Sequence, residues 1–206
     1  MPIGAFAYSE GLETLVQQDR LGTPVELRGW LEDHLRCGPV RMETAIFQRL
    51  MTATTRRQLD TLLYWDGWLT ASRESEELAL QNRQMARSLW RLLQDLMETH
   101  ALPLASSPRQ YVTAFAIASA LAGVSEREAM FTYVHAWLSN LIVAAVRLIP
   151  LGQSTGQKLL WELQDSIVQL IDFAQNAQEN ELYCWNTGII LASMQHETLY
   201  SRLYRS

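Results

Sequence analysis

Between Tyr133 and Gln157 the chain reads YVHAWLSNLIVAAVRLIPLGQSTGQ, an apolar helix followed by a polar turn. The helix carries apolar side chains on nearly every side: Trp137, Leu138, Leu141, Ile142, Ala144, Ala145, Val146, Leu148 and Ile149. This pattern is typical of a helix that other helices cover all round. Pro150 ends it, and Gly152 and Gly156 predict a turn before the next helix. We therefore expect a helical bundle assembled around this central helix.

A thin polar seam runs along the same helix. Thr132, His135, Ser139, Asn140 and Arg147 are spaced so that they lie roughly on one face. Arg147 stands out because a guanidinium among aliphatic side chains must either pair with a carboxylate or reach water. Two alternatives follow for Arg147: a structural group that snorkels from the central helix or pairs with a carboxylate inside the bundle, or a group beside the exposed turn that contacts another protein.

Size and composition indicate one folded domain. The chain has 206 residues, 48% of them hydrophobic, and a formal net charge of −5. This length allows a substantial core, and the acidic balance argues against a general nucleic-acid or anionic-membrane surface. The N-terminal MPIGAFAYSEG lacks the features of a signal peptide. The apolar run Leu141 to Val146 is far shorter than the roughly 20 residues that span a bilayer. We expect a cytoplasmic protein.

Helix start and stop signals divide the rest of the chain. Thr23, Pro24 and Glu26 form a capping signal, and Ser125 with Glu128 forms a second one before the central helix. Predicted helices cover about residues 9–20, 24–37, 39–51, 55–69, 73–99, 108–122, 126–149, 157–175 and 188–196. The threonines at 52–55 are expected to break a helix, and the serines at 9 and 72 to cap the helices that follow them. Without any strand pattern, the fold class is all-α, a single-domain bundle of about eight to ten helices.

The chain carries none of the common catalytic or nucleotide-binding motifs. GxxxxGK[ST], GxGxxG, HExxH and GxSxG are absent, and the four histidines never lie three or four residues apart. His135 could hold a haem or metal, although a hydrogen-bonded core histidine is the more common case. His196 and Glu197 are too few to define a metal site. Cys37 and Cys184 form no CxxC pair, which leaves a single disulfide between them open.

Two polar segments remain. Arg73 and Glu74 lie off the apolar stripe of the helix at 73–99, and the simplest interpretation is a solvated face. Residues 196–206, HETLYSRLYRS, alternate aromatic, aliphatic and basic groups, which are types enriched at protein interfaces. A free tail gains contact area only when a partner covers it. We expect a mobile tail that binds another protein; a mobile end without function is the alternative.

Four blocks of sequence resemble the UreF family of urease accessory proteins: PIGAFAYSEGLE, ASRESEELALQNRQMARSL, AAVRLIPLGQSTGQ and ASMQHETLYSRLYRS. The resemblance implies an all-helical homodimer without catalytic activity of its own. It also implies binding to the accessory protein UreD (also called UreH), recruitment and regulation of the nickel-carrying GTPase UreG, and docking on apo-urease. The assembly would handle nickel, so neither a cofactor nor a metal site is expected in this chain.

The resemblance also assigns individual positions. The partner-binding candidates are Arg147, Gln153, His196, Glu197, Tyr200, Ser201, Arg202, Leu203, Tyr204, Arg205 and Ser206. The motif positions are Pro2, Gly4, Tyr8, Ser9, Gly11, Glu13, Arg73, Glu74, Pro150 and Gly152. Residues 196–206 are the best UreD contact, and their removal is expected to leave the bundle folded. The rival hypothesis is a cofactor- or metal-holding helical enzyme that uses His135.

Overall fold

The computed structural model describes residues 8–96 and 107–205. These residues form ten α-helices, one 3₁₀ turn and no strand, which confirms the all-α prediction for this part of the chain. The predictions for Pro2, Gly4 and Ser206 lie outside the described residues. The elements are α1 (Leu12–Gln17), α2 (Pro24–Cys37), α3 (Pro39–Thr55), α4 (Leu59–Ala71), α5 (Glu76–Leu96), α6 (Tyr111–Leu121), α7 (Glu126–Leu148), α8 (Gln153–Glu162), α9 (Gln164–Asn176), η3 (Glu179–Glu181) and α10 (Thr187–His196).

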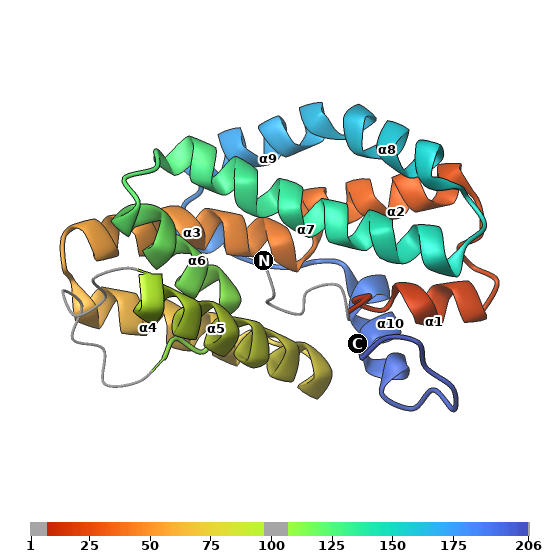
Figure 1. Ribbon diagram of the computed structural model, residues 1–206, viewed down its shortest axis with the longest axis horizontal. Helices are drawn as coiled ribbons and strands as arrows, with labels where there is room; N and C mark the ends of the chain where they lie inside the picture. Colours follow the sequence, from red (N-terminus) through yellow and green to blue (C-terminus); the bar gives the residue numbers. More distant parts are fainter. Residues whose placement is uncertain (1–7, 97–106, 206) are drawn as a thin grey trace.

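Helix α3 is the centre of the bundle. It contacts α2, α4, α6, α7 and α9, and its Ile46, Phe47 and Leu50 are completely buried. In Figure 1, α2, α7, α8 and α9 lie on one side of α3, and α4 and α5 lie on the other. Helices α1 and α10 pack together at one end. The core is therefore assembled around α3 rather than around α7.

Helix α7 is an outer helix with one covered face. Val134, Leu138 and Ala145 are completely buried against its neighbours, whereas Ala136 and Arg147 are exposed. The prediction that other helices cover it all round was wrong, because α7 lies at the side of the bundle. Among the described helices, α7 alone is long and apolar enough to cross a membrane by length and composition, and half of its most apolar window is buried in the bundle.

Local hydrogen bonds move two predicted helix boundaries. The hydroxyls of Thr54 and Thr55 donate to carbonyl oxygens four residues earlier, at 2.8 and 3.0 Å, so α3 continues through these threonines. Helix α5 is capped by Ser75, whose hydroxyl accepts from the Leu78 N–H at 3.2 Å. The hydroxyl of Ser72 instead donates to a carbonyl at the end of α4.

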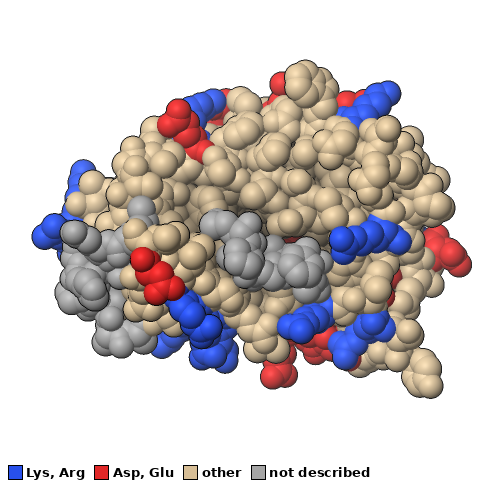
Figure 2. Space-filling model, in the orientation of Figure 1, with Lys and Arg blue, Asp and Glu red and all other residues tan. Residues whose placement is uncertain are grey.

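The predicted capping box at Thr23 and Glu26 is confirmed, and the Ser125 hydroxyl caps α7. The turn predicted between Gly152 and Gly156 ends at Gly152: α8 begins at Gln153, so Gly156 lies inside this helix. The single long helix expected from residue 157 is divided in two at Leu163. On the face shown in Figure 2, acidic and basic side chains are scattered, mostly near the outline, rather than gathered into one basic field.

Gly11 is required where α1 meets α10. Its φ is +86°, a left-handed conformation, and a Cβ atom there would lie 2.8 Å from the Ser193 nitrogen. The predicted cap, Ser9, is buried, but α1 begins only after Gly11. We expect Gly11→Ala to lower the free energy of unfolding by about 1–3 kcal/mol through backbone strain, and by more through the clash.

Gly29→Ala is the matched control in a denaturant titration. Gly29 lies inside α2, and a Cβ atom added there would meet nothing within 4 Å beyond its chain neighbours and the backbone of its own helix. Alanine at this position should therefore raise stability by about 0.5–1 kcal/mol. Equal effects of the two substitutions would contradict the close approach of α1 and α10.

Candidate functional site

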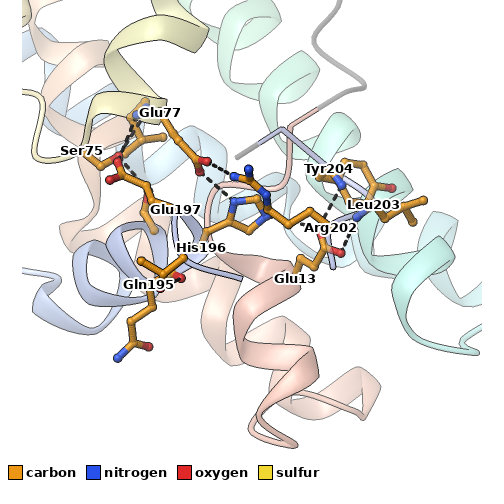
Figure 3. A network of polar contacts seen from close by, with 12 residues as sticks. Glu13, Ser75, Glu77, Gln195, His196, Glu197, Arg202, Leu203 and Tyr204 are labelled. Carbon is orange, nitrogen blue, oxygen red and sulfur yellow. Dashed lines mark hydrogen bonds and ion pairs between the residues drawn. The ribbon is translucent and has the colours of Figure 1, made fainter. Parts of the chain in front are cut away.

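The C-terminal segment is folded back onto the bundle. Figure 3 shows residues 196–204 lying against α1 and the start of α5. The backbone N–H groups of Leu203 and Tyr204 donate to the two oxygens of the Glu13 carboxylate, at 2.7 and 2.9 Å. Tyr204 is only 5% exposed. The prediction of a free, mobile tail was therefore wrong, because a buried carboxylate on α1 binds its backbone.

His196 connects both ends of this arrangement. Its side chain is completely buried at the end of α10. Nδ1 lies 2.8 Å from a Glu77 oxygen, and Nε2 lies 3.2 Å from a Glu13 oxygen. The ring is thus hydrogen-bonded on both sides, to a carboxylate of α5 and to a carboxylate of α1. Arg202 pairs with the other oxygen of Glu77, so the C-terminal segment contacts α5 through a second side chain.

We call Glu13, Glu77, His196 and Arg202 the C-terminal network. Further contacts surround it: Gln17 donates to the Ser201 carbonyl at 3.0 Å, and the Glu77 N–H donates to Glu197 at 3.2 Å. Removing residues 196–206 would thus leave two carboxylates without their partners. The expectation that truncation spares the bundle does not fit this geometry.

The Glu10 side chain points away from the C-terminal network that contains Glu13. Glu10 has a φ of +53° next to the left-handed Gly11, and this turn sends its side chain toward α5 and α7. Its carboxylate accepts from Trp137 Nε1 at 3.0 Å and from the Gln81 amide at 3.1 Å. Tyr8 also reaches α5 and donates to Gln84 at 2.8 Å. The segment from Tyr8 to Glu13 therefore fastens α1 to three other helices.

Arg73 is not on a solvated face, contrary to the sequence interpretation. Its side chain is 4% exposed and lies 2.5 Å from the buried Glu43 carboxylate. The Tyr133 hydroxyl donates to the same carboxylate at 2.6 Å, and Arg73 donates to the side-chain carbonyl of Gln110 at 2.9 Å. Glu74, beside it, is half-buried, and burial raises the pKa of its carboxyl. Arg73 therefore belongs to a buried polar core that joins α3, α6 and α7.

A small cavity lies between these polar groups. Its volume is about 50 Å³, and Glu10, Glu43, Tyr133 and Trp137 are among the residues that line it. This volume is large enough for a few water molecules and far too small for a haem. His135 is not among the lining residues; it is half-exposed on α7 and stacks on Phe131. Among the described residues, no three His, Cys, Asp or Glu side chains are arranged to hold a metal.

The sequence model of the UreF family matches residues 21–164. The chain belongs to the UreF family. Relatives agree along the whole chain: a urease accessory protein UreF from Nostoc sp. is 44% identical over 100% of this chain and 91% of its own length. The urease accessory protein UreF from Trichormus variabilis is 46% identical over 100% of this chain and 91% of its own length. The one from Picosynechococcus sp. is 41% identical over 100% of this chain and 94% of its own length. The names of these relatives support a role in urease maturation.

Three of the four sequence blocks that resemble UreF meet in the C-terminal network. Glu13 comes from the first block, Glu77 from the second, and His196 and Arg202 from the last. Glu77, Glu10 and Glu43 were not selected from the sequence. The one signal for Glu43 was its helical spacing from Val40, Ile46 and Phe47, because a carboxylate on such an apolar face needs a buried partner.

The third block, around Arg147, lies elsewhere in this UreF-family chain. Arg147 is exposed and forms no ion pair with any described residue, so the buried-pair alternative is wrong. Pro150, Gly152 and Gln153 follow it and are also exposed. Gly152 has a φ of +75° and precedes α8. Arg147 therefore reaches water beside an exposed turn.

Several large apolar side chains of residues 183–203 face outward. They are Tyr183, Trp185, Leu191, Met194, Tyr200 and Leu203, and the exposed fraction ranges from 43% at Tyr183 to complete exposure at Tyr200. We call this set the C-terminal apolar surface. Glu197, Ser201 and Arg205 are exposed as well. The C-terminal segment thus anchors through His196, Arg202 and Tyr204 and presents its other side chains to solvent.

Glu10 makes the stability of this UreF-family chain depend on pH. Burial, and secondarily the nearby Glu43, raise the pKa of Glu10 from 4.5 to about 7. A raised carboxyl pKa means that the folded state binds more protons, so stability is lost as pH rises from about 4.5 to 7. Relative to Glu10→Gln, the native chain should lose up to roughly 3 kcal/mol over this range.

The comparison with Glu10→Gln is needed because His34 acts in the opposite direction. Burial lowers the pKa of His34 from 6.5 to about 4, so its contribution to stability is lost as pH falls through that range. Denaturant titrations of both proteins across pH isolate the Glu10 effect. Parallel stability curves for the two proteins would contradict it.

Proposed function

We propose that this chain is a non-catalytic accessory protein of urease maturation, acting in the cytoplasm and docking UreD/UreH through its C-terminal apolar surface. The observation that carries the proposal is that residues 196–205 contain two sets of side chains, one packed on the bundle and one exposed. His196, Arg202 and Tyr204 fix the segment on the bundle, while Tyr200 and Leu203 remain exposed. A surface that is ordered before binding loses less conformational entropy when a partner covers it.

The turn at Arg147 is the proposed contact for the GTPase UreG. Its support is an exposed guanidinium that pairs with no described carboxylate and lies next to the exposed Gln153 and Pro150. Arginine is enriched at energetically important interface positions. In this proposal the chain forms a homodimer, links UreD/UreH to UreG, and brings both to apo-urease. Nickel passes through the assembly as cargo and has no resident site in this chain.

A pull-down with UreD/UreH tests the first contact. Tyr200→Ala and Leu203→Ala should each weaken UreD/UreH binding by about tenfold or more, with unchanged thermal unfolding, because both side chains are exposed. Trp161→Ala is the matched control: Trp161 is 80% exposed on α8, and the variant should bind UreD/UreH normally. Full binding by both C-terminal variants would overturn the proposed docking surface.

The same assay, extended with UreG, tests Arg147. Arg147→Ala should still capture UreD/UreH but recover much less UreG from the resulting complex. Its thermal unfolding should match that of the native chain, because Arg147 has no ion-pair partner among the described residues. Undiminished UreG recovery would contradict this contact while leaving the UreD/UreH contact intact.

A further inference from the structure

The two cysteines, far apart in sequence, meet at the corner between α2 and α3. Cys37 is the last residue of α2, and only Gly38 separates it from the start of α3. Residues 181–185 pass this corner in the antiparallel direction. Arg41 donates to the Glu181 carbonyl at 3.0 Å, and the Trp185 N–H donates to the Cys37 carbonyl at 3.0 Å. This register places Cys184 beside Cys37 and Gly38.

We propose that Cys37 and Cys184 form a redox-active dithiol. Thiol–disulfide exchange with a low-molecular-weight disulfide converts this dithiol into an intramolecular disulfide. Both thiols are free, and both residues are partly exposed. The Cys37 thiol donates to the Asp33 carbonyl within its own helix, at 3.2 Å, a weak hydrogen bond that can be replaced.

The chemistry balances in two steps. One thiolate attacks a sulfur of the small disulfide, forms a mixed disulfide and releases one thiol. The second thiolate then attacks the protein sulfur of that mixed disulfide, forms the Cys37–Cys184 bond and releases the second thiol. The protein loses two electrons and two protons, and the small disulfide gains both, becoming two thiols.

The environment makes this exchange slow rather than fast at neutral pH. Burial raises the pKa of both thiols, and the Asp33 carboxylate adds to the effect at Cys37. The thiolate is the attacking species, so a smaller thiolate fraction slows each step. Rising pH should therefore accelerate the exchange. The pair would follow the sustained thiol–disulfide balance of its surroundings rather than brief oxidant pulses.

The disulfide would affect the segment that leads into α10. Tyr183 and Trp185 flank Cys184 and belong to the C-terminal apolar surface. Asn186, the next residue, caps α10 by accepting from the Ile189 N–H at 3.1 Å. A cross-link at Cys184 would hold these groups against the α2–α3 corner and restrict the segment. That this restriction alters docking rests on the proposed function; formation of the disulfide does not.

The test uses the purified full chain, first reduced and then incubated with oxidised glutathione. We expect both free thiols to disappear, the intact mass to fall by two hydrogens, and a peptide linked through Cys37 and Cys184 to appear in a digest. Thermal unfolding of the oxidised chain should move to higher temperature, since a cross-link restricts the unfolded state. Dithiothreitol should reverse all these changes.

Single variants provide the control. Cys37→Ser and Cys184→Ser should each accumulate one glutathione adduct and no internal cross-link. Two adducts on the native chain, a disulfide-linked dimer, or two unreactive thiols would each overturn the proposal. None of these measurements involves UreD/UreH, so a failure here leaves the docking proposal standing, and a failure of docking leaves the disulfide result standing.

Discussion

Replacing Glu13 with alanine is expected to lower the free energy of unfolding by about 3–5 kcal/mol, because each buried donor left without its acceptor costs about 1–3 kcal/mol. The Glu13 side chain is 4% exposed and faces the completely buried ring of His196. It also accepts the N–H groups of Leu203 and Tyr204. Alanine would leave all of these donors without their acceptor, and the C-terminal segment would lose its attachment to α1.

Two measurements check the Glu13 prediction. Urea titrations give the change in stability, and hydrogen exchange should show the Leu203 and Tyr204 amides losing protection. Glu13→Gln keeps a carbonyl acceptor but no charge, so its effect should be smaller. Glu179→Ala, which removes an exposed carboxylate in η3, should change stability by less than about 0.5 kcal/mol. Protected amides in Glu13→Ala would show that other contacts hold the segment.

Arg73→Met is expected to have an effect of similar size, about 3–5 kcal/mol. It removes the cation beside Glu43, whose side chain is 8% exposed, and leaves an uncompensated buried charge. Adding Glu43→Gln removes that charge, and its amide carbonyl still accepts from the Tyr133 hydroxyl. The double variant should therefore be more stable than Arg73→Met alone.

A double-mutant cycle measures this coupling directly. The control is Arg87→Met on the exposed face of α5, which should change stability by less than about 0.5 kcal/mol. If Arg73→Met were no more destabilising than Arg87→Met, or if the Arg73 and Glu43 effects were additive, the buried pair would not contribute as proposed.

The sequence predicted the helices well because their signals are local. The Thr23–Glu26 capping box lies within four residues and formed as expected. The sequence pattern did not predict which helix is central. Helix α3 contains Glu43, Thr44 and Arg49, which make it look less apolar than α7. In the structure each has a partner: Arg73, the Val40 carbonyl and the Ala177 carbonyl. Satisfied polar groups can be buried at little cost, and sequence patterns do not show which groups are satisfied.

The candidate site was harder to predict for the same reason. The alternation of aromatic and basic groups in residues 196–205 suits a mobile tail and a packed segment equally. The deciding partners, Glu77 and Glu13, are 119 and 183 positions from His196. Arg73 likewise looked solvated because its partner Glu43 lies on α3, whereas Arg73 itself lies in the connection between α4 and α5. Long-range pairs of this kind are visible only once the fold brings the helices together.

The bond between Glu13 and Tyr204 spans 191 positions, which has a consequence for synthesis on the ribosome. Domains fold as the chain emerges, N-terminal parts first, yet α1 lacks its final hydrogen-bond donors until Leu203 and Tyr204 have been translated. A nascent or prematurely terminated chain would carry an unsatisfied carboxylate at this corner and no exposed Tyr200 or Leu203. Only a chain translated past Tyr204 would possess both the completed contacts of α1 and the surface proposed to bind UreD/UreH.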